Sequence, residues 1–544
     1  MAQEYKLKGL SALNLKSGEK QEVEVDGIEN GKVLIANVGG KHHAMSANCT
    51  HYGAPLKLGV LTGEGRLVCA WHGACFKVST GDVEDAPALD AIAKFDILEK
   101  DGGVYIKGEE QTIKASRRQP NTRCSAHGQE KVVVVGGGSG AMGAVQALRE
   151  ESFKGSVTII SSEPNLPIDR TKLSKALIAD ASKLELRPKD WYSQSSIDLV
   201  SDEVSAVDFS AKKVSTAAGK SYPYTKLILA TGGVPKALPL PGFKDLNNVF
   251  LLRTIPDVQA ILKAVGEKKG KKIVVVGSSF IGMEVGNALS KENSVSIVGM
   301  ESAPLERVMG AEVGKIFQTT LSKNGVKFYL NASVDSATPS SSDSKSVGAV
   351  KLKDGTTLDA DLVILGIGVA PATNFLKDNP AITLEKDGSL QTDESFAVKG
   401  LSDVYAIGDI ATYPYHGPGS PGSLTRIEHW DVAQNAGRSV GLSIATNKKE
   451  GPKRFIPVFW SALGSQLRYC GNTPNGWDDM TIQGEPENGK FAAFYGKAGE
   501  TVAVASMMMD PIMTQSAELM RVGKMPGLEE LKGGLDVRTL SLVA

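Results

Sequence analysis

The sequence predicts a multidomain protein in which a small all-β domain precedes two Rossmann-type α/β domains and an α+β C-terminal domain. At 544 residues the chain exceeds what one hydrophobic core organises. Residues 1–108 consist of short strand-like runs between glycine-rich turns, with little helical periodicity. Two later segments, KVVVVGGGSGAMGAVQALREE from Lys131 and KKIVVVGSSFIGMEVGNALSKEN from Lys271, each have the pattern of a buried parallel strand, a glycine turn and a helix.

The spacing of these two units, roughly 140 residues, implies that one nucleotide-binding domain is inserted into the other. After residue 450 the runs become aromatic and strand-like before a final helix, which indicates a separate domain. The expected division is an all-β domain at 1–108, an exposed linker at 109–130, a first nucleotide domain at 131–250 and 374–450, a second at 251–373, and a C-terminal domain at 451–544.

Composition excludes several classes of protein. Lys plus Arg and Asp plus Glu both total 61, and no basic stripe occurs, which argues against a nucleic-acid partner. No apolar run approaches the ~20 residues of a membrane span. Five cysteines are too few for a secreted disulfide scaffold, and the N-terminus lacks the features of a signal peptide or presequence. We expect a cytoplasmic protein, with the mitochondrion as the alternative location.

Two short motifs, Cys49-Thr-His51 and Cys69-Ala-Trp-His72, indicate a metal centre. Two thiolates and two imidazoles are the ligand set of a Rieske [2Fe–2S] cluster, with both Cys on one iron and both His on the other. A structural zinc ion also accepts two Cys and two His. Zinc sites more often have a gap of two to four residues inside each pair, so the single-residue gap of the first motif favours the cluster.

The stretches CTHYGAPL, CAWHGACF and DAPALD resemble the ferredoxin-type Rieske fold, with Pro87 in the loop that covers the cluster. High-potential members of that family have a disulfide where this chain has Ala54 and Trp71. They also have hydroxyl donors where this chain has Ala74 and Phe76. The resemblance therefore implies that no disulfide joins the two cluster loops. It also implies a low reduction potential, at or below about −100 mV.

A phosphate-binding turn follows the strand VVVV. In the sequence Gly136-x-Gly138-x-x-Ala141, the glycines allow a dinucleotide pyrophosphate to approach the N-terminus of the next helix. An alternative register uses Gly138, Gly140 and Gly143. We prefer the earlier register because its first glycine directly follows the strand. After the next strand, VTIISSE, Glu163 is the expected ribose acceptor and Ser162 the alternative.

Four companion motifs, PIDRTKLSK, KLILATGGVPK, DVYAIGDIA and RIEHWDVAQNAGR, resemble the FAD-dependent pyridine-nucleotide reductases. The resemblance is to the oxygenase-coupled ferredoxin reductases and the apoptosis-inducing factor group, over residues 131 to about 510. It implies bound FAD in contact with Arg170, Lys175, Thr231, Gly232, Asp409, Glu428, His429, Trp430 and Trp460.

The second fingerprint, Gly277-x-Ser279-x-x-Gly282, replaces the middle glycine by another small residue that still permits close approach of a pyrophosphate. After the following strand, VSIVGME, Glu301 would bind the adenine ribose and repel a 2′-phosphate, which favours NADH over NADPH. Some family members place this acid two residues earlier, where the chain has Gly299.

The reductase resemblance also implies a catalytic pair. Lys175 and Glu284 would form an ion pair beside flavin N5, and Gly368 would complete the nicotinamide pocket. No Cys-x-x-Cys or Cys-x4-Cys pair occurs near the flavin motifs, which excludes a dithiol reductase. Electrons must therefore leave the flavin by another route.

CTHYGAPLKLGVL, WHGACFKVSTGD, EHWDVAQ and FWSALGSQLRYCG resemble the apoptosis-inducing factor-like Rieske flavoproteins across nearly the whole chain. The resemblance implies hydride transfer from NAD(P)H to FAD, then one-electron transfer across a flexible linker to the chain's own cluster. An unidentified protein or small molecule would take the electrons, and a homodimer is one expectation. The alternative hypothesis is an NADH-responsive redox sensor or cell-death signalling protein of the apoptosis-inducing factor type.

Overall fold

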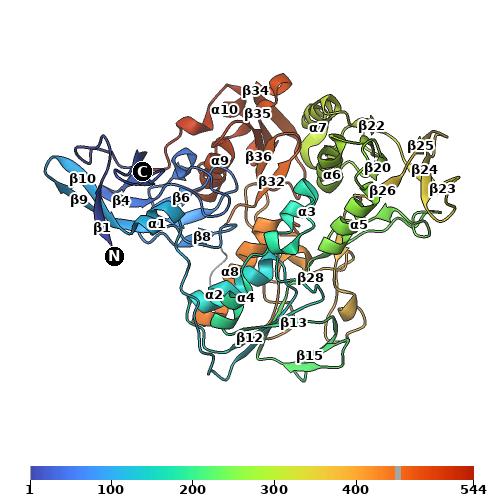
Figure 1. Cartoon of the computed structure of the whole chain (residues 1–544), viewed down its shortest axis with the longest axis horizontal. Helices are drawn as coiled ribbons and strands as arrows, with labels where there is room; N and C mark the ends of the chain where they lie inside the picture. The colour runs from blue at the N-terminus through green and yellow to red at the C-terminus, as the bar shows by residue number, and fades with distance from the viewer. Residues whose placement is uncertain (1, 448–454, 544) are drawn as a thin grey trace.

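The computed structural model describes residues 2–447 and 455–543. It confirms the predicted fold class: an all-β unit and a five-stranded C-terminal sheet lie side by side, and two parallel α/β units lie below and beside them (Figure 1). Among the described residues, no helix has the length and apolarity needed to cross a bilayer.

The N-terminal all-β unit consists of two antiparallel sheets. The strand order of the larger sheet is β1 (Gln3–Lys6), β10 (Gly103–Gly108), β9 (Lys94–Lys100), β4 (Lys41–Ser46), β3 (Lys32–Val38) and β2 (Lys20–Glu24). The smaller sheet contains β5 (Val60–Leu61), β6 (Arg66–Val68), β7 (Cys75–Lys77) and β8 (Val83–Asp85).

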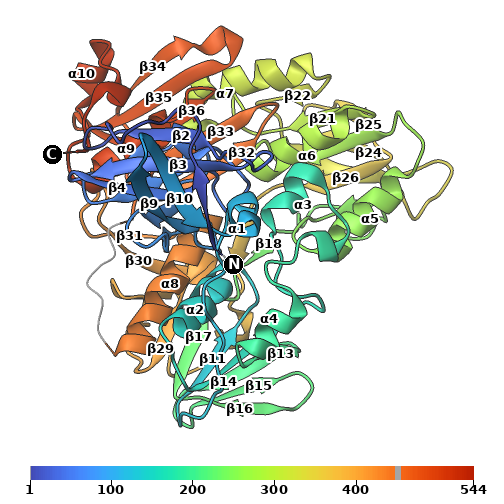
Figure 2. The same cartoon turned by 60° about the vertical axis from the view of Figure 1, so that its left-hand side comes forward.

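The first α/β unit has a five-stranded parallel sheet whose central strands are apolar and buried on both faces. Its order is β13 (Ile197–Ser201), β12 (Ser156–Ser161), β11 (Lys131–Val135), β17 (Lys226–Leu229) and β29 (Val404–Ala406). β29 comes from a segment far along the chain, as an inserted second domain requires. Helices α2 (Ser139–Glu150) and α8 (Trp430–Thr446) pack against each other beside this sheet (Figure 2).

The second α/β unit repeats this architecture. Its parallel sheet has the order β19 (Val249–Phe250), β26 (Leu362–Leu365), β20 (Lys272–Val276), β21 (Ser294–Val298) and β22 (Lys327–Tyr329). Its helices are α5 (Ile255–Val265), α6 (Phe280–Ser290) and α7 (Glu306–Lys323).

The C-terminal sheet is antiparallel, in the order β32 (Val458–Ala462), β33 (Gln466–Gly471), β36 (Glu500–Met507), β35 (Lys490–Lys497) and β34 (Asp479–Glu485). Helices α9 (Ile512–Arg521) and α10 (Leu528–Lys532) pack on it. The last residues then return to the N-terminal unit, where the Leu542 carbonyl accepts a hydrogen bond from Gly63 N at 2.9 Å.

Candidate functional site

Two matching loops bring the predicted metal ligands together. In the loop after β4, Gly53 N donates to the Cys49 carbonyl at 2.9 Å. In the loop between β6 and β7, Gly73 N donates to the Cys69 carbonyl at 3.1 Å. Both glycines have positive φ, 78° and 75°, a backbone conformation that disfavours other residues. The twin turns therefore present the two Cys-to-His segments to each other.

The ligand atoms pair by chemical type. Nδ1 of His51 lies 3.1 Å from Nδ1 of His72, and the thiols of Cys49 and Cys69 are within hydrogen-bonding contact. Burial lowers the pKa of His51 to about 4 and that of His72 well below its ordinary value, so both rings are neutral, as ligands must be. Cys49 and Cys69 are both free of disulfides.

This pairing distinguishes a cluster from a zinc ion. A single zinc ion needs four donors around one point, whereas a Rieske cluster needs a thiolate pair on one iron and an imidazole pair on the other. The geometry fits the cluster. Ala74 and Phe76 are fully buried beside the loops, and the low potential stays a prediction.

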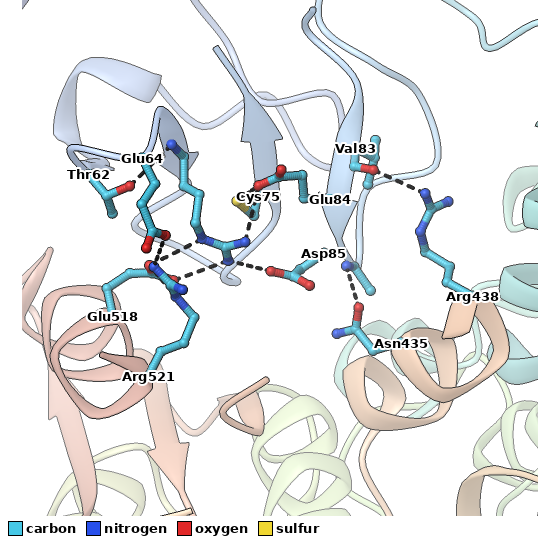
Figure 3. A network of polar contacts seen from close by, with 12 residues as sticks. Thr62, Glu64, Cys75, Val83, Glu84, Asp85, Asn435, Arg438, Glu518 and Arg521 are labelled. Carbon is cyan, nitrogen blue, oxygen red and sulfur yellow. Dashed lines mark hydrogen bonds and ion pairs between the residues drawn. The ribbon is translucent and has the colours of Figure 1, made fainter. Parts of the chain in front are cut away.

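The all-β unit is docked through a polar network (Figure 3). Arg66 on β6 donates to both carboxylate oxygens of Glu518 on α9, each at 3.2 Å, and to Glu84 at 3.1 Å. Arg521 donates to the same Glu518 at 2.8 Å and to Glu64 of the all-β unit at 2.7 Å. Bidentate arginine contacts of this kind fix orientation as well as distance.

A second set of contacts holds the loop around Pro87. Asn435 and Arg438 of α8 bond to Ala86 N and to the Val83 carbonyl, both at 3.0 Å. Further along the loop, Arg187 of the first α/β unit pairs with Asp90 at 2.6 Å, and both side chains are buried. The Asp90 carbonyl accepts the hydroxyl of Thr50, which lies between two metal ligands. The reductase thus holds the cluster-binding loop directly.

The segment 109–130, expected as an exposed linker, is mostly exposed, but it also makes specific contacts with its neighbours. The segment begins with helix α1 (Glu110–Ala115), and Arg117 then donates to Asp90 at 3.1 Å. Further on, Thr122 is buried in hydrogen-bond contact with Ser195 at 2.9 Å. Arg117 thus bonds to the all-β unit and Thr122 to the first α/β unit, while most other side chains of the segment are exposed. The two redox centres consequently have a defined relative position.

A cleft of about 640 Å³ lies between the two α/β units and the C-terminal sheet. Twelve of the residues that the sequence nominated line it: Gly138, Arg170, Lys175, Gly232, Ser279, Glu284, Gly368, Asp409, Glu428, His429, Trp430 and Trp460.

The phosphate turns have the geometry that a dinucleotide needs. Gly136 ends β11 with φ +112°, and a Cβ there would lie 2.2 Å from the Ala230 carbonyl oxygen. Gly138 caps α2, and among the described residues a Cβ built on it would meet no atom within 4 Å, which leaves room for a phosphate. Ala141 follows, buried in the first turn. This favours the earlier register.

The glycines of the alternative register serve helix packing instead. A Cβ on Gly143 would lie 2.3 Å from the Gln434 carbonyl oxygen of α8, and a Cβ on Gly437 would lie 2.0 Å from the Gly140 oxygen of α2. The second fingerprint has the same design as the first. Gly277 has φ +109°, Ser279 caps α6, and Gly282 packs against the Gly277 carbonyl.

Several nominated residues lie around the cleft rather than on its wall. Thr231 donates its hydroxyl to the Ala372 carbonyl at 2.8 Å, and Ser162 is exposed. Glu163 pairs with Arg170 through one carboxylate oxygen. Its other oxygen is buried without a hydrogen-bond partner among the described residues, as a ribose acceptor would be before ligand binding. The residues fit a bound FAD.

Three cleft residues were not singled out by the motifs. Arg253 pairs with Asp409 at 2.8 Å, Arg426 pairs with Glu428, and Phe459 stacks on His429 with ring centroids 4.9 Å apart. Burial lowers the pKa of His429 to about 4, so it lines the cleft as a neutral ring. Arg426 is the first residue of the motif that contains Glu428 and His429, so the sequence could have nominated it as a cleft residue. Arg253 had none.

Lys175 and Glu284 meet as the resemblance implied. Lys175 Nζ lies 3.0 Å from Glu284 Oε1, and the carboxylate is 2% exposed. Ser174 and Ser461 also donate their hydroxyls to it. Glu301 lies outside the cleft wall after β21, where Arg307 Nε contacts it at 2.7 Å.

Trp460 connects the cleft to the metal ligands. It lies on β32, is 5% exposed and lines the cleft. Its ring centroid is 4.6 Å from that of His72 and 5.7 Å from that of His51. The imidazole side of the metal centre therefore faces the nucleotide cleft across one indole ring.

Comparisons with known proteins agree with this site. A family model described as pyridine nucleotide-disulphide oxidoreductase matches residues 130–437, and one described as Rieske [2Fe-2S] domain matches residues 6–96. Apoptosis-inducing factor 3 of Mus musculus is 37% identical over 520 residues, covering 94% of this chain and 83% of the relative. The chain is also similar to the 5,5′-dehydrodivanillate O-demethylase ferredoxin reductase subunit of Sphingobium sp. (29% identity; 68% of this chain, 88% of the relative).

Among solved structures, the covalent putidaredoxin reductase–putidaredoxin complex matches with a TM-score of 0.70 and 25% identity, covering 76% of this chain and 98% of that chain. The family matches confirm the predicted Rieske [2Fe–2S] cluster, FAD and NAD(P)H. The chain therefore belongs to the pyridine nucleotide-disulphide oxidoreductase family, as an FAD-dependent NAD(P)H oxidoreductase of the apoptosis-inducing factor-like Rieske flavoprotein group.

Proposed function

We propose that the chain passes electrons from NAD(P)H through FAD to its own Rieske cluster, and from there to a separate acceptor. The observation that carries the proposal is the contact between Trp460 and the ring of His72, because it joins the nucleotide cleft to the metal ligands within one chain. FAD supplies two-electron hydride acceptance, and the [2Fe–2S] cluster carries one electron at a time.

The chain's own residues hold and orient these groups. The two glycine turns and their helix N-termini would receive the pyrophosphates, and Lys175 with Glu284 would fix the polar end of the cleft. The aromatic wall formed by buried Trp460 and half-buried Phe459 would limit the access of water beside it. Docking through Arg66 and Asp90 keeps the imidazole ligands against this wall.

The relatives support the direction of transfer. One similar protein is named as the ferredoxin reductase subunit of an O-demethylase, and one solved structure is a reductase joined to putidaredoxin. In this chain the reductase and the iron–sulfur domain would be one polypeptide. Five cysteines without disulfides support a reducing compartment such as the cytoplasm. The homodimer stays a prediction.

Anaerobic stopped-flow reduction with NADH tests the proposal. In the holoprotein, flavin absorbance should bleach first and the cluster signal should follow, with cluster reduction confirmed by EPR. Trp460→Leu should slow the second phase by roughly tenfold or more, about 1.4 kcal/mol on its barrier. Trp477→Leu is the matched control, because Trp477 packs on Tyr495, outside the cleft lining and the metal ligands. Equal cluster reduction in both variants would contradict the proposed path.

Coenzyme preference gives a second expected result. Glu301→Gln should raise the NADPH-to-NADH ratio of kcat/KM by about tenfold, since it removes a repulsive charge and frees Arg307 for a 2′-phosphate. Glu292→Gln, an exposed glutamate paired with Lys269, controls for the change in net charge. An unchanged ratio in Glu301→Gln would show that another residue determines the preference between NADH and NADPH.

A further inference from the structure

The docked position of the Rieske domain raises the question of where electrons leave. The docked domains largely enclose the imidazole pair: His72 is buried and His51 is half-buried. His72 is 5% exposed, and Trp460, which covers the imidazole pair from the cleft side, is also 5% exposed. An outside acceptor therefore cannot occupy the position of Trp460 while the domain is docked as the structure shows.

One exposed ring also contacts the imidazole pair. Tyr52 follows His51 in the chain and stacks on it, with ring centroids 3.7 Å apart and an interplanar angle of 19°. It is 36% exposed, seven times as exposed as Trp460. Trp71 is the other aromatic neighbour, but its ring centroid is farther away, at 6.3 Å from that of His72. The Arg468 guanidinium lies over this ring, which is half-buried.

Contacts to the reductase hold Tyr52 in this orientation. Its hydroxyl donates to the buried carboxylate of Asp169, in the segment just before α3 (Thr171–Ala176). The Lys172 ammonium lies 4.6 Å from the centroid of the same ring and 3.6 Å from Asp169. The Lys172 side chain is 34% exposed and that of Asp169 only 10%, so the outward charge at this place is positive.

We propose, on the basis of the proposed function, that Tyr52 and Lys172 mark the surface at which electrons leave the chain. The partner is a one-electron acceptor whose contacting face is negatively charged. At each encounter one electron moves from the reduced cluster to the acceptor, with no bond made or broken and no proton transferred. Trp460 would then serve the donor and Tyr52 the acceptor, each through its ring contact with the imidazole pair.

Two redox probes of opposite charge test this surface. The cluster of the holoprotein is reduced with dithionite, so the experiment does not depend on NADH, and its oxidation by ferricyanide or by hexaammineruthenium(III) is followed. Lys172→Glu should slow ferricyanide by about threefold or more and accelerate hexaammineruthenium(III). The difference should vanish near 1 M salt, where screening acts within about 3 Å. Lys269→Glu, at an exposed lysine of the second α/β unit, is the control of equal charge change.

A binding measurement accompanies the kinetics. Hexacyanochromate(III) exchanges no electron but is paramagnetic, so it should enhance relaxation of the cluster EPR signal more in the wild-type protein than in Lys172→Glu. Rate changes of the same sign for both probes would indicate an altered potential and overturn the proposal. So would a Lys172→Glu variant that behaves like Lys269→Glu. If the domain had to undock, Arg521→Gln, which loosens the docking network, would accelerate both probes, and the proposal would also fail.

Discussion

Arg187→Met should leave flavin reduction by NADH intact while cluster reduction largely fails, and it should lower the free energy of unfolding by about 3–5 kcal/mol. The guanidinium pairs with Asp90 at 2.6 Å, and both side chains are nearly inaccessible to water, at 6% and 5% exposure. It also donates to the Leu89 carbonyl at 2.8 Å and to Gln146 at 3.0 Å. Removing it leaves a buried carboxylate beside the loop that carries Cys49 and His51.

Chemical denaturation and NADH stopped-flow measure the two effects of Arg187→Met. Arg118→Met is the matched control, because Arg118 forms an exposed ion pair with Asp82 and such pairs contribute about 1 kcal/mol or less. Adding Asp90→Asn to Arg187→Met should restore part of the stability, since it removes a buried charge that would be left with only the half-exposed Arg117 as its partner. If Arg187→Met and Arg118→Met were alike in both measurements, the buried pair would not position the cluster loop.

Lys175→Met should have the opposite kinetic signature. Glu284 would keep its two serine donors but lose the ammonium at 3.0 Å, in a place where the carboxylate is 2% exposed. We expect flavin reduction by NADH to slow by roughly 10²-fold, the usual cost of removing one preorganised charge from a closed site. A stability loss of about 3 kcal/mol should accompany it.

Stopped-flow at the flavin band checks this expectation. Lys175→Arg keeps the positive charge but replaces the compact ammonium by a planar guanidinium. Its rate of flavin reduction should therefore lie between those of wild type and Lys175→Met. In both variants the cluster phase, once the flavin is reduced, should keep its wild-type rate constant. A slow cluster phase with normal flavin reduction would contradict the assignment of this pair to the hydride step.

The fold class and the local chemistry could be predicted because both depend on short sequence patterns. The turns at Gly136 and Gly277 follow directly from a strand, a glycine and a helix. The Cys49 and Cys69 loops use the same backbone turn, so their ligands converge whatever surrounds them. The position of Lys175 beside Glu284 required the family resemblance, because the two residues come from different domains.

The arrangement of the domains could not be predicted in this way. Arg66 and Glu518 are 452 positions apart, and neither belongs to a recognisable motif. The contacts of Arg117 and Thr122 within the exposed segment 109–130 were not predicted, because a polar segment has the same composition whether it is hydrated or bonded to neighbours. Such interfaces depend on single long-range pairs, for which one sequence carries no periodic signal.

The separation of Arg66 from Glu518 also has a consequence for synthesis of the chain. At about 5–20 residues per second, a ribosome needs roughly 20–90 s to add the 452 positions between them. For most of that interval, once residue 108 has been added, the N-terminal domain is present without the helix that will cover it. Iron and sulfide can then reach His51 and His72 from the side that Trp460 later closes. Cluster delivery to the nascent chain thus has a time window that ends when the last domain folds.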